Sequence, residues 1–139
     1  MLEKEVCERI KKRFESQDFL SFVGMKLEYV DKGKAVISCE NKKEFSQYLG
    51  YMHGGMVSAI ADTAGGHAAA TMLKEGYKTV TSELKIHFLK PVVSKKVIAT
   101  GEVLSAGKRL IIVETTVRDE EDNMLAKMIA TMFVIEPSE

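Results

Sequence analysis

One stretch of this chain combines residue types that attack a carbonyl group with types that stabilise the resulting negative charge. Gln47 precedes the triplet His53-Gly54-Gly55, and Asp62 follows His53 by nine residues inside a segment rich in Ala and Gly. An acid costs several kcal/mol to bury charged and unpaired, so a lone carboxylate among small apolar residues calls for an explanation. The residue types alone allow two: a chemical role, or an acid on a polar helix face paired with a lysine.

The two glycines predict how an anionic oxygen would be held. A helix that begins at Gly54 leaves its first backbone N–H groups without intrahelical acceptors, and the helix dipole makes that end electropositive. Such N–H groups beside a carboxylate suit attack on a carbonyl, because negative charge grows on the carbonyl oxygen. Glycine is also common at helix starts, so the pattern gains its weight from the acid that follows it.

Hydrophobic spacing predicts the helix that would carry Asp62. Apolar residues recur at helical intervals from residue 54 to 74, and Gly76 is a suitable stop. Gly65 and Gly66 each cost about 1 kcal/mol relative to alanine in the middle of a helix. We therefore expect another element to pack very closely there, as in a sheet wrapped around the helix.

The remaining pattern predicts a second helix and several strands. Apolar residues at four-residue spacing indicate an amphipathic helix over residues 3–15, and residues 21–23 are expected to lead into the first strand. Strands are expected over residues 26–30, 35–40, 77–89, 97–104, 110–118 and 124–135. This order suits an α+β fold, either a curved antiparallel sheet around the long helix or a sandwich with the helix on one face.

The strand after the long helix is expected to alternate strictly. Period two places the polar residues on one face and the apolar residues on the core face; the polar set is Thr81, Glu83, Lys85 and His87, and the other set is Ser82, Leu84, Ile86 and Phe88. An apolar edge strand is a liability unless it is covered, which favours oligomerisation.

Composition limits the class of protein. The 139 residues form one domain, 1–139, with an N-terminal helix and lead-in over 1–20 and a core over 21–136. Twenty basic and twenty acidic residues cancel, so there is no net positive field for non-specific nucleic-acid binding. We expect no membrane span and a cytoplasmic location. The three histidines form no metal motif, and no metal is expected.

The segment Gln47-x5-His53-Gly54-Gly55-x6-Asp62 resembles the active-site segment of hotdog-fold acyl-CoA thioesterases. The similarity is greatest to the branch with the phenylacetate-pathway and 4-hydroxybenzoyl-CoA thioesterases, and the layout agrees over residues 24–136. This resemblance implies a curved sheet of five to six strands around a long central helix. It also implies hydrolysis of an acyl-CoA without a further cofactor, since coenzyme A is part of the substrate.

The resemblance implies a role for each residue of the segment. Asp62 would activate water or attack the thioester itself, while the N–H groups of Gly54 and Gly55 hold the thioester oxygen. Gln47 would donate to that oxygen or position the water. His53 would hydrogen-bond near the carbonyl, or only cap the helix. Gln47 resembles the 4-hydroxybenzoyl-CoA branch and Asp62 the phenylacetate branch, so the segment does not fix the acyl group.

Residues outside the segment complete the expected site. In this family a Ser or Thr often holds the water or the carboxylate; Gly66 has no hydroxyl for this, whereas Thr81 has one. Lys90, Lys108 and Arg109 lie near strand ends, where they would bind the phosphates of coenzyme A or would simply be solvated. The resemblance further implies a homodimer, arranged as a dimer of dimers, in which Gln47 and Gly54 come from one subunit and Asp62 from the other.

Two other functions are compatible with the same residues. A hotdog dehydratase acting on 3-hydroxyacyl thioesters would pair a histidine such as His53 with Asp62. A non-catalytic acyl-CoA-binding protein would hold the thioester without cleaving it. The glycine pair favours hydrolysis, because its N–H groups suit the oxyanion formed when a thioester is attacked.

Overall fold

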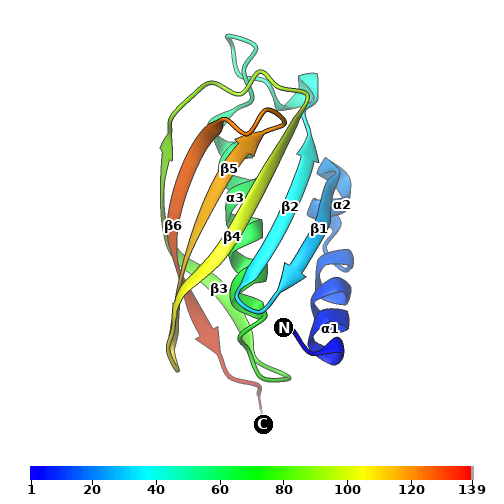
Figure 1. Cartoon of the computed structure of the whole chain (residues 1–139), viewed down its shortest axis with the longest axis vertical. Coiled ribbons are helices and arrows are strands. Elements are labelled where there is room, and N and C mark those ends of the chain that lie inside the picture. Colours follow the sequence, from blue (N-terminus) through cyan, green and yellow to red (C-terminus); the bar gives the residue numbers. More distant parts are fainter. Residues whose placement is uncertain (139) are drawn as a thin grey trace.

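A curved sheet of six antiparallel strands surrounds one long helix in the computed structural model, which describes residues 1–138 (Figure 1). The central helix is α3, Gly54–Ala70. The strands are β1 (Met25–Asp31), β2 (Lys34–Glu40), β3 (Lys78–Phe88), β4 (Lys96–Ala106), β5 (Leu110–Asp119) and β6 (Met124–Ile135). Their order across the sheet is β1-β2-β4-β5-β6-β3. The expected hotdog arrangement is confirmed, and it places α3 inside the concave face of the sheet.

The N-terminal region contains two helices where we expected one helix and a lead-in. α1 (Lys4–Glu15) agrees with the predicted amphipathic helix and buries Ile10 and Phe14. Residues 18–23, however, form the short helix α2 (Asp18–Val23). Leu20 and Val23 are three residues apart, so one face of a helical turn buries both. A helix of six residues is too short to show this spacing as a clear period in the sequence.

The two glycines in the middle of α3 have different surroundings. A Cβ at Gly65 would lie 2.9 Å from Cγ2 of Val113 on β5, so this glycine permits the close packing that we expected. A Cβ at Gly66 would meet no atom within 4 Å. Close packing therefore explains only Gly65, and Gly66 faces open space.

The helix ends earlier than predicted. α3 stops at Ala70, where residue 74 was expected. The Thr71 hydroxyl donates to the Ala68 carbonyl and accepts from the Gly33 N–H, so it ties the helix end to the turn between β1 and β2. A short polar side chain that bonds back to the helix favours its termination.

Strand β3 does not alternate strictly, because it contains a bulge. Thr81 pairs with Met132 and Glu83 with Thr131, which leaves Ser82 as an extra residue. Thr81 contacts α3 through its hydroxyl, and Phe88 also reaches α3, lying against Gly54. The prediction that Thr81 shares a face with Glu83, Lys85 and His87 was therefore wrong, since one inserted residue reverses the faces beyond it.

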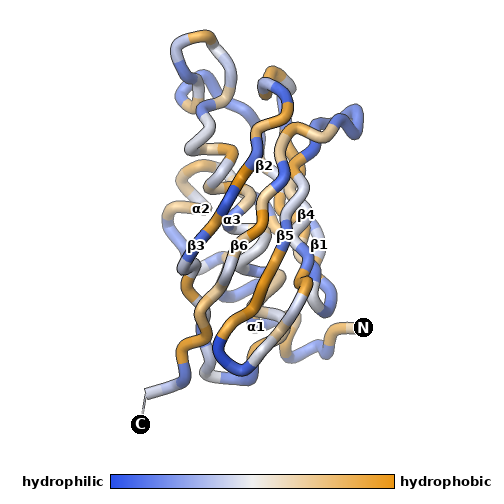
Figure 2. The backbone as a smooth tube through the Cα atoms, turned by 90° about the vertical axis from the view of Figure 1, so that its left-hand side faces the viewer, coloured by the Kyte–Doolittle hydropathy of each residue, from blue (hydrophilic) through white to orange (hydrophobic). Residues whose placement is uncertain are grey.

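Strand β3 is an edge of the sheet with exposed apolar side chains. The rotated view in Figure 2 shows hydrophilic and hydrophobic positions interleaved along it. Val80, Leu84 and Phe88 are 52%, 37% and 54% exposed, which is high for large apolar residues in a strand. Pairing with a second chain would cover them, but the dimer remains a prediction. No helix among residues 1–138 has the length and hydrophobicity needed to cross a bilayer.

Candidate active site

Asp62 is half-buried on the side of α3 that faces β3. The Thr81 hydroxyl donates a hydrogen bond of 2.7 Å to the Oδ1 atom of Asp62. Within the described chain the ion pairs are Arg118–Asp122 and Lys127–Glu114, so the carboxylate of Asp62 has no lysine partner. The alternative of an acid paired on a polar helix face is thus absent, and the carboxylate keeps a free oxygen.

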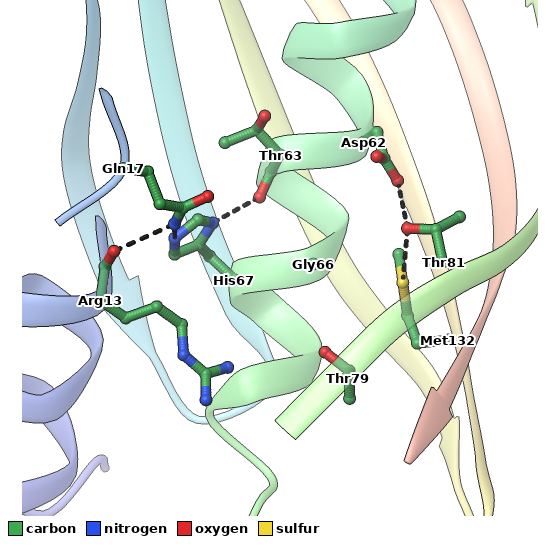
Figure 3. Close-up of a pocket in the computed structure, with 9 residues that line it drawn as sticks. All are labelled: Arg13, Gln17, Asp62, Thr63, Gly66, His67, Thr79, Thr81 and Met132. Atoms are coloured by element: carbon green, nitrogen blue, oxygen red, sulfur yellow. Dashed lines mark hydrogen bonds between the residues drawn. The ribbon is translucent and has the colours of Figure 1, made fainter. Parts of the chain in front are cut away.

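A polar cavity of about 170 Å³ opens beside Asp62. Figure 3 shows Asp62 and Thr81 on one side of α3, His67 with Gln17 and Arg13 on the other, and Gly66 between them. The lining residues are Arg13, Gln17, Asp62, Thr63, Gly66, His67, Thr79, Thr81 and Met132. An engineered cavity of about 150 Å³ holds benzene in other proteins, so this space suits a group the size of one ring.

His67 forms a fixed part of the cavity wall. Its Nδ1 lies 2.7 Å from the Thr63 carbonyl, which only accepts, so this nitrogen carries the proton. Its Nε2 is then the acceptor for the Gln17 amide at 3.4 Å. Burial lowers the pKa of His67, the Thr63 hydrogen bond opposes that shift, and the charge of Arg13 adds to it. His67 is therefore held as a neutral ring in one tautomer.

At the start of α3, the histidine side chain caps the helix. His53 Nδ1 accepts a hydrogen bond of 2.8 Å from the N–H of Gly55. The expectation that both glycines offer free N–H groups is therefore wrong for Gly55, whose donor is occupied. The N–H of Gly54 has no acceptor within the described chain, and it is the donor available to a substrate oxygen.

Gln47 lines the same cavity as that free donor. Its Oε1 accepts from the backbone N–H groups of Leu49 and Tyr51, which fixes the orientation of the amide. The Nε2 group makes no hydrogen bond with residues 1–138 and is left as a donor. Gln47 and Gly54 line the same cavity of about 370 Å³, so the structure brings two of the predicted donors together.

The cavity at Gln47 is mostly apolar, in contrast to the one at Asp62. Its other lining residues are Tyr51, Met52, Val57, Phe88, Leu89, Lys90, Pro91 and Val92. Lys90 is the one predicted phosphate-binding residue in this group. The other two, Lys108 and Arg109, lie in the turn between β4 and β5, and Lys108 lines a separate cavity with Leu73 and Tyr77.

A single chain keeps the acid apart from the oxygen-binding donors. Gly54 and Asp62 are eight positions apart on α3, which at 1.5 Å per residue is about 12 Å along the helix axis. They also line different cavities. One carbonyl group cannot touch both within one chain, so the predicted set is incomplete unless a second subunit completes it.

Sequence reasoning missed the residues that the N-terminal region contributes to the Asp62 cavity. Arg13 lies on the amphipathic helix α1 and Gln17 just before α2, and polar residues at such positions usually face solvent. Nothing in their spacing indicates that α1 packs beside α3. Among residues 1–138 no group of three His, Cys, Asp or Glu side chains is placed to bind a metal ion.

Comparison with known proteins places this chain in a family. Residues 49–126 match the model of the thioesterase superfamily. A protein of Saccharolobus solfataricus named "Putative esterase" is 33% identical over 127 residues, which are 91% of this chain and 90% of that protein. The 1,4-dihydroxy-2-naphthoyl-CoA hydrolase of Listeria monocytogenes is 29% identical over 103 residues, covering 74% of this chain and 84% of that protein.

Solved structures agree with the fold. The Escherichia coli PaaI protein from the phenylacetic acid degradation operon superposes with a TM-score of 0.91 and 21% identity, over 99% of both chains. A thioesterase family protein from Silicibacter pomeroyi gives a TM-score of 0.90 and 23% identity, over 94% of this chain and 98% of that one. At these identities the likeness establishes the fold.

Proposed function

This chain belongs to the thioesterase superfamily and is a thioester hydrolase, and we propose that its substrate is an acyl-CoA, hydrolysed to the free acid and coenzyme A. The observation that carries the assignment of the acid is the state of Asp62. It is half-buried, has no cationic partner within the described chain, and opens onto a cavity large enough for an acyl group. One relative is named as the hydrolase of a CoA thioester, which supports coenzyme A as the thiol part of the substrate.

The reaction needs a base and an oxyanion site. Asp62 takes a proton from water as the water oxygen attacks the thioester carbon. The carbonyl oxygen becomes negatively charged and accepts hydrogen bonds from the Gly54 N–H and the Gln47 amide. When the C–O double bond reforms, the C–S bond breaks and coenzyme A leaves as its thiolate.

Direct attack by Asp62 uses the same residues. The carboxylate would then form a mixed anhydride with the acyl group, expelling the thiolate, and water would hydrolyse the anhydride. In both routes Thr81 holds the carboxylate through its hydroxyl, which leaves one Asp62 oxygen free to react. Incubation in ¹⁸O-water under single-turnover conditions identifies the anhydride route if a solvent oxygen appears in the Asp62 carboxylate, which requires water to attack the Asp62 carbon of the anhydride.

We propose that the complete site lies between two subunits. Gln47 and Gly54 of one subunit would hold the thioester oxygen, and Asp62 of a second copy would act on the carbonyl carbon. The distance of about 12 Å along α3 supports this division, since one chain cannot supply both parts to one carbonyl. Pairing through the exposed β3 edge would also bury the apolar side chains on that strand.

A thiol-release assay tests the proposed activity. Acetyl-, hexanoyl-, palmitoyl-, phenylacetyl- and hydroxybenzoyl-CoA would be supplied to wild-type protein and to Asp62→Asn, with protein-only blanks because Cys7 and Cys39 also contain thiols. We expect wild-type protein to release coenzyme A, and the variant to be slower by on the order of 10²–10⁴-fold. Asp18→Asn, a change at an exposed acid on α2, is the matched control. Wild-type turnover by a folded Asp62→Asn would contradict the assignment.

The dehydratase alternative is weaker in this structure. His53 uses Nδ1 to cap α3 and lines a cavity with Phe19, Phe22 and Phe45, whereas Asp62 lines another. His53 and Asp62 therefore do not meet at one site in a single chain. A change in enoyl absorbance without thiol release would nevertheless favour that reaction, and tight acyl-CoA binding without product would favour the binding protein.

A further inference from the structure

Arg13 is a half-buried cation without an anionic partner. It extends from α1 toward α3 and lines the Asp62 cavity (Figure 3). Of its five N–H donors, the described contacts use one, from an Nη2 group to the Tyr77 carbonyl at 3.2 Å. No ion pair with Arg13 occurs within the described chain. Burial lowers the pKa of its guanidinium, and the nearby charge of Arg9 lowers it further.

A half-buried guanidinium without an anionic partner favours binding of an anion. Removing a cation from water is unfavourable unless an opposite charge and hydrogen bonds compensate it. A guanidinium binds a carboxylate with two parallel hydrogen bonds, which are stronger than bonds between neutral groups. A hydroxyl would satisfy one donor of Arg13 but would leave its charge uncompensated.

The cavity connects Asp62 to this cation. Both residues line it, from opposite sides, and Gly66 lies between them (Figure 3). A Cβ at Gly66 would meet nothing within 4 Å, so this part of α3 leaves the space beside it clear. An acyl chain whose carbonyl carbon is at Asp62 can therefore pass over Gly66 toward Arg13. An anion bound at Arg13 would lie across the cavity from the Asp62 carboxylate, and this separation reduces the repulsion between the two negative charges.

We propose that Arg13 is a specificity-determining residue that binds a carboxylate at the far end of the acyl group. This inference rests on the proposed thioesterase function and on Asp62 as its acid. The favoured substrates are then thioesters of dicarboxylic acids, with one acid joined to coenzyme A and the other ionised. Gln17, on the same wall, donates its amide N–H groups to the Arg13 carbonyl and to His67, which keeps α1 against α3.

Matched thioesters test this proposal. Hexanoyl-CoA, 6-hydroxyhexanoyl-CoA and hexanedioyl-CoA differ only in ending with a methyl, a hydroxyl or a carboxylate, and the set is repeated at butanoyl and octanoyl lengths. We expect that, for at least one acyl-chain length, wild-type protein has a higher kcat/KM for the carboxylate-ended thioester than for the methyl- and hydroxyl-ended ones. Arg13→Met should lower the ratio of kcat/KM for carboxylate over methyl by on the order of tenfold to a hundredfold, mainly through KM.

Two variants control for structural effects. Arg9→Met removes a guanidinium that also bonds a carbonyl, that of Leu73, but lines a different cavity, and it should keep the wild-type ratio. Arg13→Lys keeps the charge and should retain part of the preference. Thermal unfolding of each variant shows whether it is folded.

The results separate this inference from the proposed function. If Arg13→Met lost activity equally on the methyl-, hydroxyl- and carboxylate-ended thioesters, Arg13 would be only structural. That result would overturn the inference. A wild-type preference for methyl or hydroxyl ends at every length would also overturn it, while thiol release that depends on Asp62 would leave the thioesterase proposal intact. Release of thiol from no thioester would overturn both.

Discussion

Single residues in this structure depend on contacts that the sequence does not reveal. The spacing of Gln47, His53, Gly54 and Asp62 allowed the acid and a helix-start donor to be predicted. It did not show that the His53 ring occupies the N–H of Gly55, because the choice between capping and binding depends on a side-chain rotamer. Nor did it show that Arg13 lines the same cavity as Asp62, since α1 and α3 are far apart in the chain.

The buried ring of His67 predicts a pH dependence of stability. Its pKa is lowered from 6.5, so below about pH 6.5 the unfolded chain binds a proton that the folded chain does not. This contribution to the free energy of unfolding is therefore complete above that pH and is lost as the pH falls below it. We expect the melting temperature of wild-type protein to fall more between about pH 7.5 and 5.5 than that of His67→Gln.

An exposed histidine on β3 provides the control for this measurement. His87→Gln removes an imidazole that is exposed, and it is the matched control for His67→Gln. Asp31 and Asp119 have lowered pKa values, but they titrate below 3.8 and outside this window. An identical pH response in wild-type protein and His67→Gln would contradict the account of the buried ring.

At the scale of elements, hydrophobic period predicted the helices and strands well where they are long. α3 and β6 began at the predicted residues, because their patterns extend over several turns or pleats. The bulge at Ser82 was not predicted, since it depends on the pairing between β3 and β6. This bulge matters for the site, because it places Thr81 on the side of Asp62.

The packing of α3 in the sheet predicts opposite effects for two neighbouring glycines. Gly65→Ala adds a methyl group close to Val113 and Thr115, and should lower the free energy of unfolding by about 1–3 kcal/mol. Gly66→Ala adds a methyl group in open space. It should raise the free energy of unfolding by up to about 1 kcal/mol, because alanine has a higher helix propensity than glycine. Denaturant titration of both variants checks this, and a destabilised Gly66→Ala would contradict it.

At the scale of the whole molecule, the candidate site residues predicted from the sequence lie in two separate cavities of one chain. Gln47 and Gly54 line one cavity and Asp62 another, in a chain whose β3 edge exposes apolar residues. We propose that Asp62 of one subunit acts on a thioester held by Gln47 and Gly54 of its partner. Such a site has to be tested in the assembly, because variants of one residue cannot show which subunit supplies it.

Mixing two inactive variants tests that claim most directly. Asp62→Asn and Gln47→Ala would each be purified, mixed in equal amounts, unfolded and refolded together, and assayed for thiol release beside each variant alone. A shared site leaves one intact site in every mixed dimer, so we predict recovery of roughly a quarter of wild-type activity. A site within one chain is damaged in every subunit of the mixture. No recovery, with mixed dimers present, would contradict the shared site.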